Sequence, residues 1–166
     1  MYQAIGEAAL AVVLAGLTPG VEPRYALIIA LAAGMSLAES LALSLAAVAL
    51  LSITLTLAVD VVVSLSRRIC SAWSFKANPA CLYLKARERG ARKLAPYLDK
   101  WGLAGLALFV ALPLPATGMY TGAAAAALLG VRGVRLAAAL AVGGSASVAL
   151  MAMLAAAGIV ALDSIS

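Results

Sequence analysis

The sequence contains no histidine and few charged residues, with 12 Lys and Arg and 7 Asp and Glu among 166 residues. Without histidine, the chain cannot form a Ser-His or an H-E-x-x-H catalytic site. Asp60 is the one aspartate inside a long apolar segment, whereas an intramembrane aspartyl dyad needs two. The sequence therefore predicts that the chain is not an enzyme and that it uses no metal ion or other cofactor.

Cysteine is also scarce, because Cys70 and Cys81 are the only two and their spacing is not C-x-x-C. With no histidine to complete a ligand set, a metal site is not expected. We expect two free thiols in a reducing compartment. A disulfide between them would instead place their segment outside the cell.

No Lys or Arg precedes the first apolar stretch, although a cleavable secretory signal normally begins with positive charge. We therefore expect the N-terminal residues to belong to the mature protein. The basic residues are few and accompany no recognisable nucleic-acid motif, so nucleic acid is not an expected partner.

Apolar residues dominate what the sequence does contain. They make up 65% of the chain, against about 45–50% in soluble domains. Residues 40–59 and 136–162 carry no charge, and each run exceeds the roughly 18 residues that indicate a spanning helix. The composition predicts an all-α integral membrane protein of the plasma membrane, with residues 1–166 forming a single membrane domain.

The punctuating Pro and Gly residues indicate an internal repeat. When the sequence is shifted by 96 positions, several of them superpose without a gap. The superposed pairs are Gly6 with Gly102, Pro19 with Pro115, and Gly34 with Gly130. We therefore expect one unit at about 4–65, a linker at about 66–100 and a second unit at about 101–162.

Each unit begins with two short apolar segments around a break. The first two span about 15 residues each, which is too short to cross a hydrocarbon core of about 30 Å. If both pairs are re-entrant hairpins, the linker and the turn with Arg132 and Arg135 share one face, which then carries every Lys and Arg except Arg24. This charge distribution predicts a cytoplasmic linker and both termini outside. Two hairpin-plus-helix units entering from opposite sides form an inverted repeat, as in many secondary transporters.

The linker combines basic residues with aromatic ones such as Trp73 and Tyr97. This pattern is typical of short amphipathic helices that lie on the cytoplasmic surface and contact anionic lipids. That the charge only fixes the orientation of the chain remains an alternative.

Three charged residues fall within the predicted apolar zone. Glu22 and Arg24 flank Pro23 at the first break, and Asp60 lies inside the first long helix. An unpaired charge at the bilayer centre costs about 2.5–3.5 kcal/mol on insertion scales, so Arg24 should pair with Glu22 or Asp60. We expect Glu22 and Asp60 to be proton or cation sites, with Arg24 as their counter-ion or as an anion anchor. A purely structural ion pair remains the alternative.

The second break has hydroxyl groups and prolines but no charge. Prolines leave backbone carbonyls without donors, so this backbone must be buried in protein or line water. The spacing of Gly118 and Gly122 favours close helix packing, and packing alone is as good an explanation of this break as substrate contact. The candidate substrate-lining residues of both breaks are Pro19, Pro113, Pro115, Thr117, Tyr120 and Thr121.

The two breaks, PGVEPRY at 19–25 and PLPATGMYTG at 113–122, resemble the signature segments of the "putative small multidrug export" proteins. That family resembles the wider DedA (SNARE-associated or VTT) superfamily. The resemblance implies proton-dependent membrane transport, with Glu22 and Arg24 at a hairpin tip. The DedA relatives imply movement of polyprenyl phosphate or phospholipid. The second break lacks the Arg or Glu expected of the DedA branch.

The resulting functional prediction is proton- or cation-coupled export of a small solute or drug. A lipid flippase or scramblase, and a structural membrane protein without transport, are the alternatives. Because two spans and two hairpins are few elements with which to enclose a path, we expect a homodimer or a larger homo-oligomer.

Overall fold

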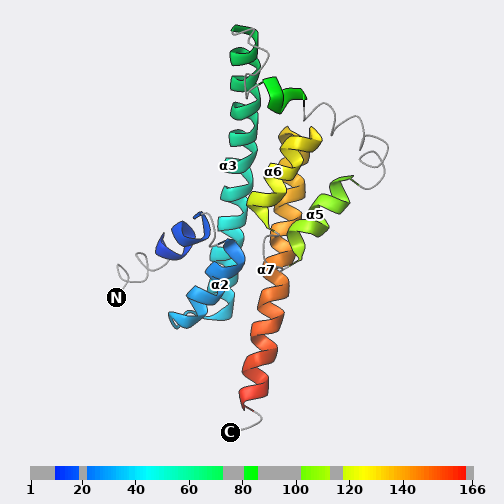
Figure 1. Ribbon diagram of the computed structural model, residues 1–166. Helices are drawn as coiled ribbons and strands as arrows, with labels where there is room; N and C mark the ends of the chain where they lie inside the picture. Colours follow the sequence, from blue (N-terminus) through cyan, green and yellow to red (C-terminus); the bar gives the residue numbers. More distant parts are fainter. Residues whose placement is uncertain (1–9, 19–21, 73–80, 86–101, 113–117, 164–166) are drawn as a thin grey trace.

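A computed structural model describes residues 10–18, 22–72, 81–85, 102–112 and 118–163. These residues form helices and no strands, which confirms the predicted all-α class (Figure 1). Residues 10–16 and 81–85 form short helical segments. The labelled helices are α2 (Pro23–Ala32), α3 (Leu37–Ala72), α5 (Leu103–Ala111), α6 (Met119–Leu129) and α7 (Gly133–Asp163).

Two of these helices, α3 and α7, are long and apolar enough to cross a membrane, over Leu37–Ser71 and Gly133–Gly158. They pack side by side and run in opposite directions (Figure 1). Two contacts fix their register, because Asp60 of α3 meets Arg132 just before α7, and Val48 of α3 lies against Gly144 of α7. The molecule is therefore built around an antiparallel pair of spanning helices.

Helix α3 begins with a capping box. The backbone N–H of Ser36 donates to Glu39 Oε2 at 2.9 Å, and the N–H of Glu39 donates to Ser36 Oγ at 3.3 Å. These two bonds satisfy amides that have no partner within the helix. The helix continues without a break to Ala72, so the first residues of the predicted linker, Arg67 and Arg68 among them, extend α3.

Glycines on α7 bring the central helices close together. A Cβ atom added at Gly143 would lie 2.5 Å from the carbonyl oxygen of Ala107 in α5. One added at Gly144 would lie 2.9 Å from Val48 in α3. In a membrane, small residues let helix backbones approach and gain packing contacts. Helix α7 therefore serves as the common packing surface for α3 and α5.

The two turns that precede the long helices have the same backbone geometry. Gly34 and Gly130, 96 positions apart, both have φ of 84°, the left-handed conformation that glycine adopts readily. Each turn also closes with the same type of bond, from the residue after the glycine to a carbonyl five residues earlier. These bonds are Met35 N to Ala30 O at 3.1 Å and Val131 N to Ala126 O at 3.0 Å. The helices that flank each turn begin at matching positions, with α2 and α6 at Pro23 and Met119, and α3 and α7 at Leu37 and Gly133.

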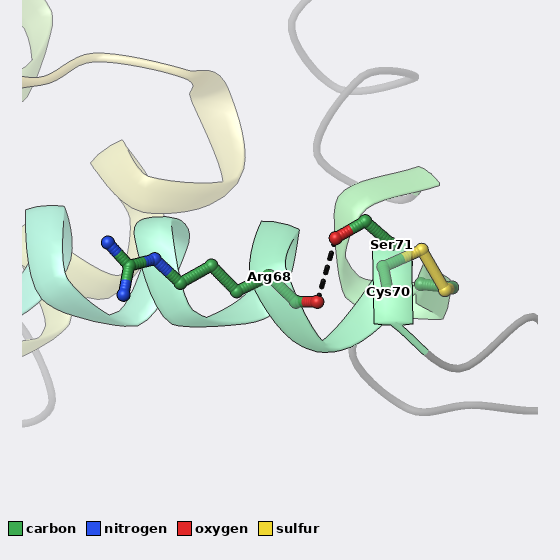
Figure 2. The surroundings of a disulfide bond; sticks show 4 residues. Arg68, Cys70 and Ser71 are labelled. Atoms are coloured by element: carbon green, nitrogen blue, oxygen red, sulfur yellow. Dashed lines mark hydrogen bonds between the residues drawn. A yellow bond between two sulfur atoms is a disulfide. The ribbon is translucent and has the colours of Figure 1, made fainter.

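The expectation of two free thiols is wrong, because Cys70 and Cys81 form a disulfide (Figure 2). Their Cα atoms are 5.1 Å apart. The bond holds the segment 81–85 beside the last turns of α3, and Tyr83 packs against the main hydrophobic core. Spacing alone did not predict this pairing, because it depends on the unbroken continuation of α3 to Ala72. Most of the predicted linker, at 73–80 and 86–100, lies outside the described residues, as do both chain ends.

Candidate functional site

A buried ion pair lies at the first break. Pro23 occupies the first position of α2, where its missing N–H costs no helical hydrogen bond. Glu22 precedes it and Arg24 follows, with Arg24 Nη2 3.2 Å from Glu22 Oε2. The two side chains are only 6% (Arg24) and 13% (Glu22) exposed, and the guanidinium lies 5.1 Å from the centre of the Tyr25 ring. Of the two partners predicted for Arg24, the structure selects Glu22.

The same pair reaches both sides of the second break. Arg24 Nη1 donates to the carbonyl of Leu112, 3.2 Å away, where α5 ends. A carbonyl at a helix C-terminus has no donor within the helix, so the arginine supplies one. The carboxylate of Glu22 accepts from the backbone amides of Met119 and Tyr120, in the first turn of α6. A negative charge at this end of a helix is favoured by the helix dipole.

Gly118 makes room for this carboxylate. A Cβ atom at Gly118 would lie 1.9 Å from Glu22 Oε1, far inside contact distance. The φ of Gly118 is 172°, an extended value open to any residue, so space and not backbone conformation requires glycine here. Under the shift of 96 positions, Gly118 is the counterpart of Glu22. The Glu22 side chain of the first break therefore fills the space that Gly118 leaves at the second break.

A second contact between the breaks is made by a side chain of the second break. The hydroxyl of Tyr120 donates to the carbonyl of Leu17, at the end of the helical segment 10–16. Tyr120 is the counterpart of Arg24 under the same shift, and Arg24 donates to the end of α5. Each break thus caps the helix that leads into the other break.

The remaining predicted residues of the second break have local roles. Thr121 Oγ1 donates to the carbonyl of Gly118 at 3.1 Å. A Cβ atom at Gly122 would lie 2.5 Å from Val110, so Gly122 brings α5 and α6 together, whereas Gly118 faces Glu22. The predicted candidates Pro19, Pro113, Pro115 and Thr117 lie outside the described residues.

Asp60 does not join the buried pair. Its carboxylate accepts from Arg132 Nε at 2.8 Å, and the two side chains are 33% (Asp60) and 30% (Arg132) exposed. Of the two predicted partners of Arg24, Asp60 is therefore the one that pairs elsewhere. Arg132 was not predicted as the partner of Asp60, because the two lie 72 positions apart in the sequence. Only the antiparallel register of α3 and α7 brings them together.

A small cavity adjoins the Glu22–Arg24 pair, with walls contributed by α2, α3, α5, α6 and α7. Its volume is about 10 Å³, which is close to the minimum that holds one water molecule. Its polar lining consists of Glu22, Arg24 and Ser147. Ser147 was not predicted, because a single serine in a long apolar helix gives no signal of its own. Within the described ranges, no three acidic or Cys side chains gather as a metal site would require.

These features define an all-helical membrane protein in which a buried ion pair joins two broken-helix segments. Residues 22–150 match the family described as "Putative small multi-drug export protein", and the chain belongs to this family. The matched range begins at Glu22 and includes the second break. No curated protein and no solved structure is significantly similar to the chain. The wider resemblance to the DedA superfamily is not shown by these comparisons and stays a prediction.

Proposed function

We propose that the protein exports a small solute or drug across the plasma membrane, with a proton or other cation as the coupling ion. The Glu22–Arg24 pair is its central site. The observation that carries the proposal is that this pair is buried between the two broken segments. The chain also belongs to a family described as small multidrug export proteins. Intramembrane charges of this kind are expensive and typically mark an ion or substrate pathway.

The depth of the site supports this role. Val48, which lines the cavity, lies eleven residues after the start of α3. At 1.5 Å per residue this is about 16 Å, or half of a hydrocarbon core of about 30 Å. Asp60 lies twelve residues further along α3, about 18 Å from the same level. With the membrane boundary taken at Leu37, Glu22 lies near the middle of the membrane, and Asp60 is too far away to share an ion with it.

The inverted repeat of two re-entrant hairpins is part of the proposal. It is supported by the equal geometry of the Gly34 and Gly130 turns and by the reciprocal caps at the two breaks. In Figure 1, α5 and α6 form a V that opens toward the start of α7, while α2 leads to the opposite end of the molecule, where α3 begins. Two halves inserted from opposite sides meet at their tips, where transporters of this architecture hold substrate.

In this mechanism, Glu22 accepts and releases the coupling ion, and Arg24 holds the counter-charge. When Glu22 is charged, Arg24 and the amides of α6 stabilise it. When Glu22 is neutralised, the contact between the two tips weakens, since its strength depends on the carboxylate charge. Movement of one tip relative to the other then follows from protonation.

A cavity of about 10 Å³ is far smaller than the roughly 300–1,000 Å³ of a drug-sized pocket. We therefore take the described arrangement as closed and propose that substrate enters only when the tips separate. A homodimer or larger homo-oligomer would supply the remaining walls of the path. Light scattering of the purified protein in mild detergent tests this, and an active monomer would contradict it.

The membrane orientation rests on charge. Nine of the twelve Lys and Arg residues lie in the linker, and Arg132 and Arg135 lie where α7 begins. This charge favours a cytoplasmic linker, where anionic lipids would contact it. The Cys70–Cys81 disulfide suits an oxidising compartment instead. We give the charge greater weight, because many residues contribute to it. An impermeant maleimide applied to intact cells should then leave both cysteines unlabelled, even after treatment with an impermeant reductant.

Reconstitution in liposomes tests the function directly. The probes are ethidium as a drug-like solute and a fluorescent phosphatidylglycerol, each followed with and without a pH gradient. We expect gradient-dependent movement of ethidium that Glu22→Gln abolishes and Asp60→Asn leaves intact. Movement of lipid without ethidium would replace solute export with lipid translocation. Ethidium movement that does not change with Glu22→Gln would remove the pair from the mechanism.

A further inference from the structure

Three buried serines of the long helices differ from five other hydroxyl residues of α3. Ser40 and Ser44 of α3 are fully buried, and Ser147 of α7 is 3% exposed. None of their Oγ atoms has a hydrogen-bond partner among the described residues. By contrast, five other hydroxyls of α3 each donate to a carbonyl three or four residues earlier, the usual arrangement in helices. These five belong to Ser52, Thr54, Thr56, Ser64 and Ser71.

Ser147 and Ser44 lie at one level of the α3–α7 pair, and Ser40 lies one turn beyond them. Ser147 lines the cavity beside Glu22 and Arg24. Val48 lies against Gly144 in the antiparallel pair, so Ser44, one turn before Val48, is at the level of α7 that carries Ser147. Ser40 lies one further turn away, about 6 Å along the helix, and only three residues after Leu37. The hydroxyls therefore lead from the cavity toward the end of the molecule where α3 begins.

We propose that Ser147, Ser44 and Ser40 form a hydrated path along which water, and the protons it carries, reach Glu22. A buried hydroxyl without a protein partner is normally satisfied by water. The cavity holds about one water molecule and is too small for a larger solute. The titratable and charged groups around its inner end are Glu22 and Arg24 from the first break and Tyr120 from α6. At the outer end, Glu39 follows the cap of α3.

The path rests on the proposed function only in taking Glu22 as the group that it serves. A thiol introduced into the chain tests its hydration without any transport assay. Both cysteines of the sequence are joined in the disulfide, so a new cysteine contributes the only S–H infrared band. After transfer into D₂O, we expect the thiols of Ser44→Cys and Ser147→Cys to exchange at least about tenfold faster than a dry buried thiol, which must wait for local opening.

Val63→Cys is the matched dry control, because Val63 is fully buried on the same helix, fifteen residues beyond Val48. Exchange at Ser44→Cys and Ser147→Cys as slow as at Val63→Cys would overturn the path. Fast exchange without ethidium transport would keep the path and reject the proposed function. Slow exchange with ethidium transport would reject the path and keep the proposed function.

Melting temperatures of alanine variants keep the proposal testable if a cysteine variant does not fold. If water binds the serines, Ser44→Ala and Ser147→Ala should melt at a lower temperature than the parent protein, because the bound water loses a partner. If the serines are dry, removing an unsatisfied hydroxyl should raise the melting temperature. Ser52→Ala is the control, since Ser52 is equally buried but donates to Ala49. A rise for both test variants and not for Ser52→Ala would contradict the path.

Discussion

The two ion pairs of the described residues lie at different depths and have different surroundings. Glu22 and Arg24 are almost fully buried and contact α5 and α6 as well as each other. Asp60 and Arg132 are about one-third exposed and lie near the start of α7. Burial strengthens a pair's interactions but makes a missing partner costly, whereas an exposed pair can be lost with little effect. The comparison predicts that only the first pair controls both stability and transport.

Removing the arginine of the buried pair should have the largest effect. Arg24→Ala leaves a buried carboxylate without its counter-charge, and we expect it to lower the free energy of unfolding by about 3–5 kcal/mol. Circular dichroism at increasing SDS fractions in mild detergent measures this change. The double variant Glu22→Ala with Arg24→Ala should recover part of the loss, because it leaves no lone charge. If Arg24→Ala is as stable as the parent protein, the Glu22–Arg24 pair does not hold the two breaks together.

The contact between Glu22 and Gly118 allows a sharper test. Gly118→Ala should cost about 1–3 kcal/mol, because its methyl group would overlap the Glu22 carboxylate. The same change in a Glu22→Ala background should cost much less, since the space is then free. The coupling energy from this double-variant cycle measures the contact directly. Additive effects would mean that the carboxylate does not occupy the space beside Gly118.

Tyr120 allows a test of the contact that the second break makes with the first. Tyr120→Phe removes the donor to the Leu17 carbonyl and keeps the ring, so we expect a loss of about 1 kcal/mol. Thr121→Val is the control, because the Thr121 hydroxyl donates within its own helix end and not to the first break. An effect of Tyr120→Phe no larger than that of Thr121→Val would contradict the reciprocal capping.

Much of this arrangement could be predicted from local sequence. The uncharged runs predicted the two long helices that can span a membrane. The prolines and glycines that recur 96 positions apart predicted two breaks, and the helices after these breaks begin at matching positions. Local signals suffice where backbone chemistry decides the outcome, as at Pro23 and Gly34. The S-x-x-E spacing of Ser36 and Glu39 is likewise a local signature of a capping box.

Contacts between distant segments could not be predicted in the same way. The pairing of Asp60 with Arg132 and the position of Ser147 beside the cavity depend on the register of α3 against α7. Helix packing in a membrane sets that register through small residues such as Gly144, and an Ala- and Gly-rich sequence offers many similar surfaces. The role of Gly118 could not be predicted either, because its neighbour Glu22 lies 96 positions away.

The Asp60–Arg132 pair completes the comparison with the smallest expected effect. Asp60→Asn or Arg132→Gln should change the free energy of unfolding by at most about 1 kcal/mol, because partial exposure lets solvent screen the remaining charge. Transport of ethidium should continue in both variants, in contrast to Glu22→Gln. The same SDS titration and flux assay apply, with the double variant as control. A loss as large as that of Arg24→Ala would show that the second pair is buried in the membrane-embedded protein, and the distinction between the two pairs would then fail.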